Sequence, residues 1–142
     1  MSDPGNQPFT AAIGEAGGPD LSILGNTVRH PVEHVESFPA PDGCCSVRFS
    51  SEELMSMCPV TAQPDISSVV IEYEPDHWCV ESKSLKLYLW SFRDRAMFAE
   101  ALAVEIADEF VHSVDPKRVT VTLTQRPRGG IELQTVCVRT RS

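Results

Sequence analysis

A segment of strict alternation in the last quarter of the chain constrains the fold most. Between residues 118 and 125 three apolar residues alternate with three threonines, Val119, Val121 and Leu123 against Thr120, Thr122 and Thr124. A period of two is typical of a strand with one buried face. The turn Arg126-Pro127-Arg128-Gly129-Gly130 separates it from a second β-rich segment, Ile131–Val138. The two segments therefore predict an antiparallel hairpin.

The segments before this hairpin predict further strands and helices. The strongest is a helix in which Phe98, Leu102, Ile106 and Phe110 lie four residues apart. In chain order we predict a strand at Cys45–Ser50, a short helix at Glu52–Met57 capped by Ser50 or Ser51, a strand at Ile66–Glu74, and helices at Ser82–Arg93 and Ala96–Ser113. This order favours an α+β fold, an antiparallel four-stranded sheet with both helices on one face. Four strands and two helices bury little area, which favours assembly into closed oligomeric barrels.

Composition bounds the domain organisation and the partners. Few apolar residues recur early in the chain, so we expect residues 1–27 to be a flexible tail and residues 28–142 to be a single domain. Residues 25–41 are expected to form an ordered but irregular arm. The net charge of −8 argues against a general nucleic-acid binder. No apolar stretch approaches the ~20 residues that span a bilayer, so no membrane partner is expected.

The cysteines indicate a reducing compartment. There are five, an odd number, and no signal-peptide pattern precedes them. We therefore expect a cytoplasmic protein with reduced thiols. The chain has no CxxC pair, and His77 with Cys79 is its closest histidine–cysteine spacing, so no metal site is predicted.

One stretch, Cys58-Pro59-Val60-Thr61-Ala62-Gln63-Pro64-Asp65, carries the residue types of covalent catalysis. Its two prolines and its lack of apolar periodicity predict a stiff, extended loop. Such a loop holds Cys58 and Asp65 at a set separation, as a nucleophile and its proton donor require. A buried cysteine beside a turn aspartate is the alternative interpretation of the same residues.

A second stretch, Glu81-Ser82-Lys83-Ser84-Leu85-Lys86-Leu87-Tyr88, opens the first long helix. Free N–H groups at a helix start bind anions, and the two lysines add positive charge. A solvated amphipathic helix start explains the same residues without a ligand.

These motifs together resemble the short, single-domain QueF-type 7-cyano-7-deazaguanine reductases, which have the tunnelling fold. The resemblance covers about residues 28–138. CPVTAQPD is similar to the catalytic loop of the family, although glycine is more usual at Ala62, and ESKSLKLY is similar to its NADPH-binding signature. Phe98-Ala99-Glu100 resembles a Phe-His-Glu motif with Ala99 in place of the histidine, and the turn at residues 126–131 resembles a Pro-Arg-Gly-Gly turn.

The resemblance implies NADPH-dependent reduction of a nitrile to a primary amine, with four electrons from two NADPH, in the synthesis of the tRNA base queuosine. Cys58 would add to the nitrile carbon as a thioimide, and Asp65 would protonate the nitrogen. Glu100 would bind the guanidine-like edge of the substrate. The remaining implied contacts are Glu81 and Ser82 to substrate, and Lys83, Ser84, Lys86, Tyr88 and Arg128 to cofactor.

The resemblance also implies a homo-oligomer with sites between subunits. Two alternatives remain open at this point. One is a tunnelling-fold relative that forms an amidine from the same nitrile, which would not need ESKSLKLY. The other is a non-catalytic purine-binding or assembly protein, which would not need both Cys58 and Asp65.

Overall fold

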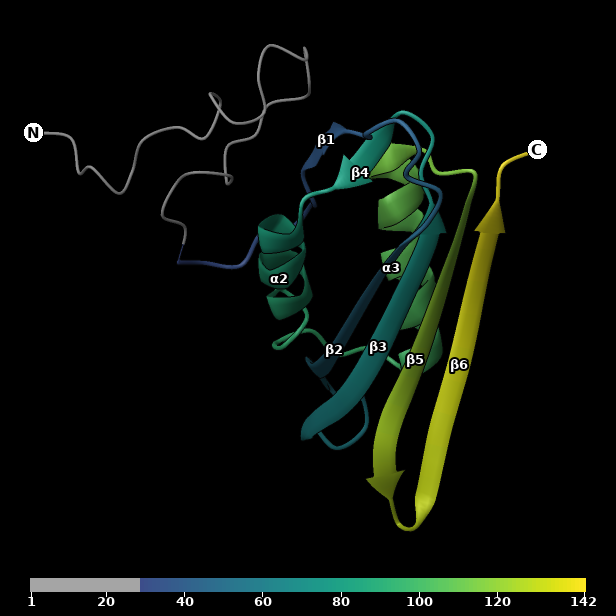
Figure 1. Ribbon diagram of the computed structural model, residues 1–142. Coiled ribbons are helices and arrows are strands. Elements are labelled where there is room, and N and C mark those ends of the chain that lie inside the picture. The colour runs from purple at the N-terminus through teal and green to yellow at the C-terminus, as the bar shows by residue number, and fades with distance from the viewer. Residues whose placement is uncertain (1–28) are drawn as a thin grey trace, which may run out of the picture.

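A computed structural model describes residues 29–142 of the chain (Figure 1). The predicted tail, residues 1–27, lies outside this range, and the predicted domain boundary stays a prediction. In order, the elements are β1 Ser37–Pro39, β2 Val47–Met57, β3 Pro64–Glu74, β4 Trp78–Val80, α2 Ser82–Trp90, α3 Ala99–Val114, β5 Arg118–Arg128 and β6 Ile131–Thr140.

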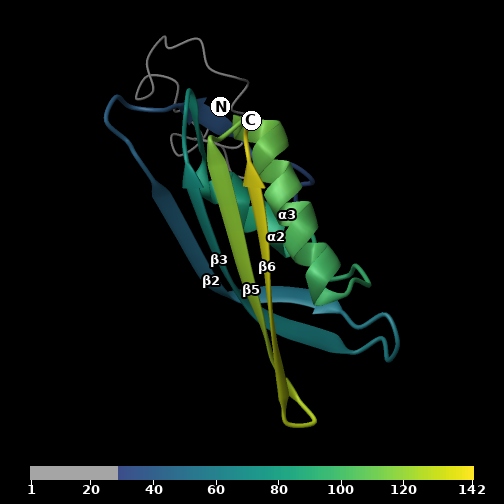
Figure 2. The same cartoon turned by 90° about the vertical axis from the view of Figure 1, so that its right-hand side faces the viewer.

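The main sheet has four antiparallel strands in the order β2-β3-β5-β6. Both helices lie on one face of it, with α3 over β5 and β6 and α2 over β2 (Figures 1 and 2). The predicted α+β class and the ββααββ order are thereby confirmed. Neither described helix is long and apolar enough to cross a membrane.

The core lies between the sheet and the helices. The alternating apolar residues of β5 face it, as predicted, and their neighbours on β3 (Val69, Ile71 and Tyr73) do the same. Helix α3 contributes Leu102, Ile106 and Phe110, three of the four residues that predicted it. The fourth, Phe98, precedes the helix and is exposed rather than part of the core. The apolar residues of the alternating strands and those of the helix therefore pack against one another in a single core.

The predicted short helix at Glu52–Met57 is wrong. Strand β2 runs through it and pairs with β3 as far as Met57 opposite Pro64, with a register shift between Ser51 and Leu54. The hydrogen bond that suggested a cap does exist, since the backbone N–H of Glu53 donates to Ser51 Oγ at 3.2 Å. This local contact sits at a β-bulge, where the extra residue accommodates it without breaking the strand.

The hairpin between β5 and β6 is longer than predicted. Strand β5 continues past Gln125 to Arg128, and the turn itself is only Gly129-Gly130, with φ values of 60° and 79°. Positive φ at both turn residues is the two-residue hairpin geometry that glycine permits. The extension carries the Arg128 side chain to the end of the sheet.

A small second sheet has one of its two strands, β1, in the segment predicted to be irregular. Strand β1 pairs with β4 antiparallel, so that Phe38 lies opposite Cys79. Helix boundaries also differ by a few residues: α2 ends at Trp90, and α3 begins at Ala99. Three-residue strands carry too little alternation to be recognised in sequence.

Candidate active site

The Cys58 loop joins β2 to β3 and is tightly hydrogen-bonded. The backbone N–H of Cys58 donates to the Gln63 carbonyl at 2.8 Å, and that of Ala62 donates to the Cys58 carbonyl at 3.0 Å. Ala62 adopts φ 55°, a left-handed conformation that favours glycine. The loop is therefore a compact turn, more closed than the extended loop expected, and its backbone explains why glycine is more usual at Ala62 in the resembled family.

The Cys58 thiol has a lowered pKa. Cys58 is buried, at 8% exposed, yet its pKa falls from an ordinary 9.0 to about 7. The largest cause is the Thr61 hydroxyl, followed by the backbone N–H groups of Thr61 and Val60, with a smaller effect of Arg128. Burial opposes these effects. Hydrogen bonds that stabilise the anion outweigh its loss of solvation, so the turn makes a thiolate available near neutral pH.

Asp65 is buried and held by an arginine. The carboxylate is 3% exposed, and Arg128 Nη1 donates to its Oδ1 at 2.6 Å. The other Arg128 nitrogen, Nη2, donates to Gln125 Oε1 at 2.9 Å. A guanidinium anchored at two nitrogens has a restricted orientation, so the end of the long hairpin positions the carboxylate.

The sheet register places the Asp65 carboxylate on the helix-covered face. Ser56 lies opposite Asp65, residues opposite one another point to one side, and both are buried. Cys58 follows the last residue of β2, outside the alternation of the strand, and is buried as well. Arg128 links the two groups, because it lowers the pKa of the Cys58 thiol and donates to Asp65. The predicted pairing of Cys58 with Asp65 is consistent with this backbone arrangement.

The start of α3 is attached to the same loop. Met57 donates its backbone N–H to the Arg95 carbonyl at 2.9 Å and accepts from Met97 N–H at 3.1 Å. Glu100, in the first turn of α3, is exposed. Ala99 is buried in the core, so no solvent-facing group replaces the histidine of the resembled motif.

At the start of α2 the anion-binding groups are already occupied. The buried Glu81 carboxylate accepts from the N–H groups of Lys83 at 2.8 Å and Ser84 at 2.6 Å. Ser84 Oγ donates to the Glu81 carbonyl at 2.7 Å and accepts from Glu36 N–H at 2.8 Å. Glu81 therefore caps the helix, and Ser84 connects the helix to the backbone just before β1. Ser82, Lys83 and Lys86 remain exposed.

A groove of about 660 Å³ runs between α2 and strands β2 and β3. Its polar lining includes Ser82, Lys86 and Arg93, and its apolar lining includes Leu85 and Trp90. The volume is within the range of small-molecule and cofactor sites. Of the predicted cofactor residues, Lys86 lines this groove, whereas the side chain of Tyr88 enters a different cleft between the helices.

Sequence reasoning missed two contributors to the site, namely Thr61 and Gln125. Thr61 lies inside the recognised loop, but its role depends on the turn that brings its hydroxyl to the thiol. No cluster of three or more His, Cys, Asp or Glu side chains able to hold a metal occurs among residues 29–142.

Fold and site together define a tunnelling-fold protein with a cysteine–aspartate pair at one end of its sheet. A family model described as QueF-like protein matches residues 64–142. Since that is more than half of the chain, and relatives agree along most of its length, the chain belongs to the QueF-like family.

Curated relatives include proteins named NADPH-dependent 7-cyano-7-deazaguanine reductase. The protein from Granulibacter bethesdensis is 40% identical over 119 residues, which are 80% of this chain and 78% of the relative. The protein from Ruegeria pomeroyi is 42% identical over 130 residues, 90% of this chain and 81% of the relative. The resemblance inferred from the motifs is confirmed.

Among solved structures, the apo form of the archaeosine synthase QueF-Like superposes with a TM-score of 0.65. It is 26% identical, and the match covers 72% of this chain and 98% of that protein. The tunnelling fold is confirmed by this neighbour.

Proposed function

We propose that this protein reduces the nitrile of 7-cyano-7-deazaguanine to the primary amine with NADPH, as its relatives' names describe. The observation that carries the proposal is the Cys58 thiol, whose pKa is lowered to about 7, at the end of the hairpin that also holds Asp65. A nitrile carbon accepts a nucleophile before it accepts a hydride readily, and a thiolate is such a nucleophile.

In the first step the sulfur of Cys58 bonds to the nitrile carbon, and the nitrogen gains a proton. The thiol loses one proton and the nitrogen needs one, so Asp65 balances the step by carrying it from sulfur to nitrogen. Arg128 holds the Asp65 carboxylate by its Oδ1, which leaves Oδ2 without an assigned partner among the described residues and available for this transfer. The product is a thioimide on Cys58.

Substrate orientation rests on Glu100. A carboxylate accepts two parallel N–H bonds from a guanidine-like edge, and Glu100 is exposed at the start of α3. The hydrogen bonds of Met57 join this helix start to the residue before Cys58. A short, hydrogen-bonded segment of backbone therefore fixes the position of Glu100, and of a substrate bound to it, relative to Cys58.

The groove beside α2 fits a dinucleotide phosphate. Lys86 and Arg93 supply positive charge, and the Trp90 and Leu85 side chains supply an apolar wall. These residues would hold NADPH, and the chemistry that it would supply there is hydride transfer, two hydrides for each nitrile reduced. Lys83 lies on the same exposed helix start and can contact a phosphate from outside the groove.

Amidine formation, the alternative chemistry, is not favoured. The structural neighbour called an archaeosine synthase has the same fold, so the fold alone does not separate the two activities. The relatives at 40% and 42% identity are named as reductases. The complete ESKSLKLY segment, with Lys86 in the groove, supports the reductase. A purine-binding protein without catalysis would have no use for a thiol of lowered pKa.

We also propose that the chain acts as a homo-oligomer with sites between subunits. The outer edges of β2 and β6 have no strand partner within residues 29–142. The sheet face away from the helices is half-buried at the β5 threonines and exposes Val136 and Val138 of β6. Pairing of these edges between copies would close the sheet and cover that face. The cytoplasmic location stays a prediction.

The test supplies NADPH and the nitrile to purified protein and follows the loss of NADPH absorbance. We expect consumption of two NADPH for each amine formed. Without NADPH, intact-protein mass spectrometry should show a gain of one substrate mass, absent in Cys58→Ala. An adduct that forms while NADPH is never consumed would instead support the amidine-forming chemistry.

A further inference from the structure

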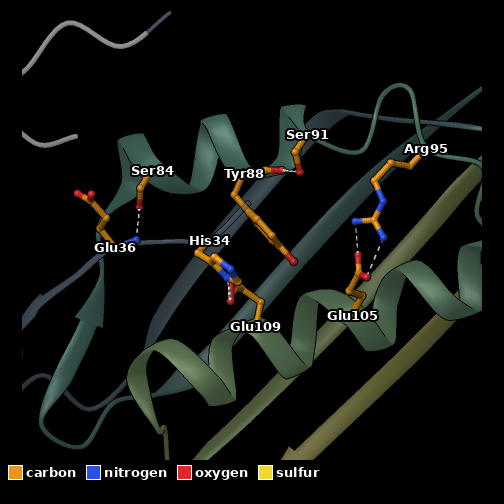
Figure 3. Close-up of polar contacts among 8 residues, drawn as sticks. All are labelled: His34, Glu36, Ser84, Tyr88, Ser91, Arg95, Glu105 and Glu109. Carbon is orange, nitrogen blue, oxygen red and sulfur yellow. Dashed lines mark hydrogen bonds and ion pairs between the residues drawn. The ribbon is translucent and has the colours of Figure 1, made fainter. Parts of the chain in front are cut away.

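A second cleft, of about 550 Å³, lies between α2 and α3. It is separate from the groove beside β2, because α2 presents Lys86 and Trp90 to the groove but Tyr88 and Ser91 to this cleft. Figure 3 shows the Tyr88 ring pointing from α2 toward α3. We call this space the interhelical cleft. The proposed reaction does not use it, although Tyr88 belongs to the ESKSLKLY segment that was predicted to contact the cofactor.

The floor of the interhelical cleft is a buried phenol whose hydroxyl is free. Tyr88 is 3% exposed, and its ring packs edge-on against Phe92 with centroids 5.1 Å apart. Ser91 Oγ donates to the Tyr88 backbone carbonyl, and no group within residues 29–142 makes a hydrogen bond to the Tyr88 hydroxyl. No fully buried side-chain oxygen in this range lacks a partner, so the hydroxyl oxygen is open to the cleft. Burial raises the Tyr88 pKa far above its ordinary value, and nearby carboxylates, Glu109 first, raise it further. The hydroxyl therefore stays protonated and can both donate and accept.

Two acid–base pairs flank this hydroxyl (Figure 3). On one side His34 Nδ1 lies 3.0 Å from both oxygens of Glu109, a carboxylate that is only 8% exposed. On the other side Arg95 binds Glu105 through two bonds of 2.7 and 2.9 Å. An ionised carboxylate has about four acceptor positions. Glu109 has one donor, His34, so it keeps capacity for a ligand.

The interhelical cleft is acidic, which favours a positively charged ligand. Four carboxylates line it, those of Glu33, Glu105, Asp108 and Glu109, against one guanidinium, that of Arg95, and the imidazoles of His34 and His112. Glu109 raises the pKa of His34, yet acidic groups still outnumber basic ones. A phosphate or nucleotide would be repelled there, in contrast to the groove that contains Lys86. A cation that carries N–H donors matches the free acceptors.

We propose that the interhelical cleft binds a small aliphatic diamine or polyamine through an ammonium group. The ammonium would donate to Glu109 and to the Tyr88 hydroxyl, over the face or edge of a buried aromatic ring. A compact ammonium has three donors and fits a site formed by one carboxylate and one hydroxyl. The remaining carboxylates at the rim would attract the second amino group of the ligand.

Isothermal titration calorimetry of the full chain with spermidine, at low salt and pH 8, tests this site. We expect one saturable site per chain. Tyr88→Phe keeps the ring and removes one hydrogen bond, so the Kd should rise about fivefold. Glu109→Gln removes a charge-assisted bond, so the Kd should rise roughly 10- to 100-fold. Circular dichroism of both variants checks that they remain folded.

The matched control is Glu132→Gln, an exposed carboxylate of β6 outside the cleft, which should leave the Kd unchanged. An equal loss in Glu132→Gln would mean that spermidine responds only to net charge, and the proposal would fail. It would also fail if magnesium chloride at matched ionic strength gave the same binding isotherm. Unchanged spermidine binding in Tyr88→Phe, together with a raised KM for NADPH, would assign the hydroxyl to the cofactor instead.

Discussion

The low pKa of Cys58 depends most on Thr61, and Thr61→Val isolates that dependence. Valine keeps the size and the branched shape of threonine and removes only the hydroxyl. The pKa of Cys58 should then rise from about 7 toward its ordinary 9.0, without reaching it, because the backbone N–H groups of Thr61 and Val60 remain. We expect a rise of about one pKa unit for the loss of one hydrogen bond to the thiolate.

This change has opposite effects at the two ends of the pH range. At pH 7 the thiolate fraction would fall from about one half to about one eleventh, roughly fivefold. The more basic thiolate is about threefold more nucleophilic, from a Brønsted slope of ~0.4–0.5. The alkylation rate at pH 7 should therefore fall only about twofold, while the rate above pH 9 should rise about threefold. The two pH–rate curves should cross.

The assay is alkylation of Cys58 by iodoacetamide as a function of pH, with the Cys58 peptide quantified by mass spectrometry. This peptide must be resolved because Cys44 and Cys45 are also accessible. Thr61→Ser retains a hydroxyl and should keep the wild-type midpoint. A Thr61→Val midpoint that remains near 7 would refute the role of the hydroxyl. Equal shifts in both variants would indicate a disturbed turn.

Three further predictions concern the same site. Asp65→Asn should slow adduct formation by ~10²–10⁴-fold with little change in substrate affinity, as measured by stopped-flow mixing and calorimetry, and a rate within threefold of wild type would exclude Asp65 as the proton carrier. Ala62→Gly should raise the free energy of unfolding in urea by about 0.5–1 kcal/mol, because φ 55° strains alanine; a less stable variant would contradict this account. Lys86→Ala should raise the KM for NADPH about 10-fold and leave adduct formation intact, whereas loss of the adduct would move Lys86 into the substrate site.

The parts of the fold that the sequence predicted are those with repeated, mutually consistent patterns. Strand β5 was recognisable because every second residue is apolar, and α3 because apolar residues recur every four. The second half of β2 was predicted to be a helix, because serines followed by acidic residues resemble a helix cap. In the structure these residues form a β-bulge. Only pairing with β3, a long-range contact, decides between the two conformations.

The roles of the site residues stay predictions, and the structure adds contacts that the sequence did not indicate. Cys58 and Asp65 were recognisable from one motif because they lie only seven residues apart, at the two ends of the turn between β2 and β3. The cofactor role of Arg128 stays a prediction. Its contact with Asp65 was not predicted, because it depends on β5 extending three residues beyond the alternating segment. The contribution of Thr61 required the turn geometry, since nothing in its spacing from Cys58 distinguishes a thiolate donor from a surface threonine.

The hydrogen bonds on both sides of Met57 have a consequence for how the family diversifies. The nucleophile is held by its own hairpin and by the segment that leads into α3, through Arg95 and Met97. None of these bonds involves α2, which carries the ESKSLKLY segment. In the proposed reaction, addition of the thiol to a nitrile and delivery of the second reactant would thus depend on separate parts of the backbone. Substitutions in α2 can change what reacts with the thioimide while leaving its formation intact, so a reductase and an amidine-forming enzyme can share one scaffold.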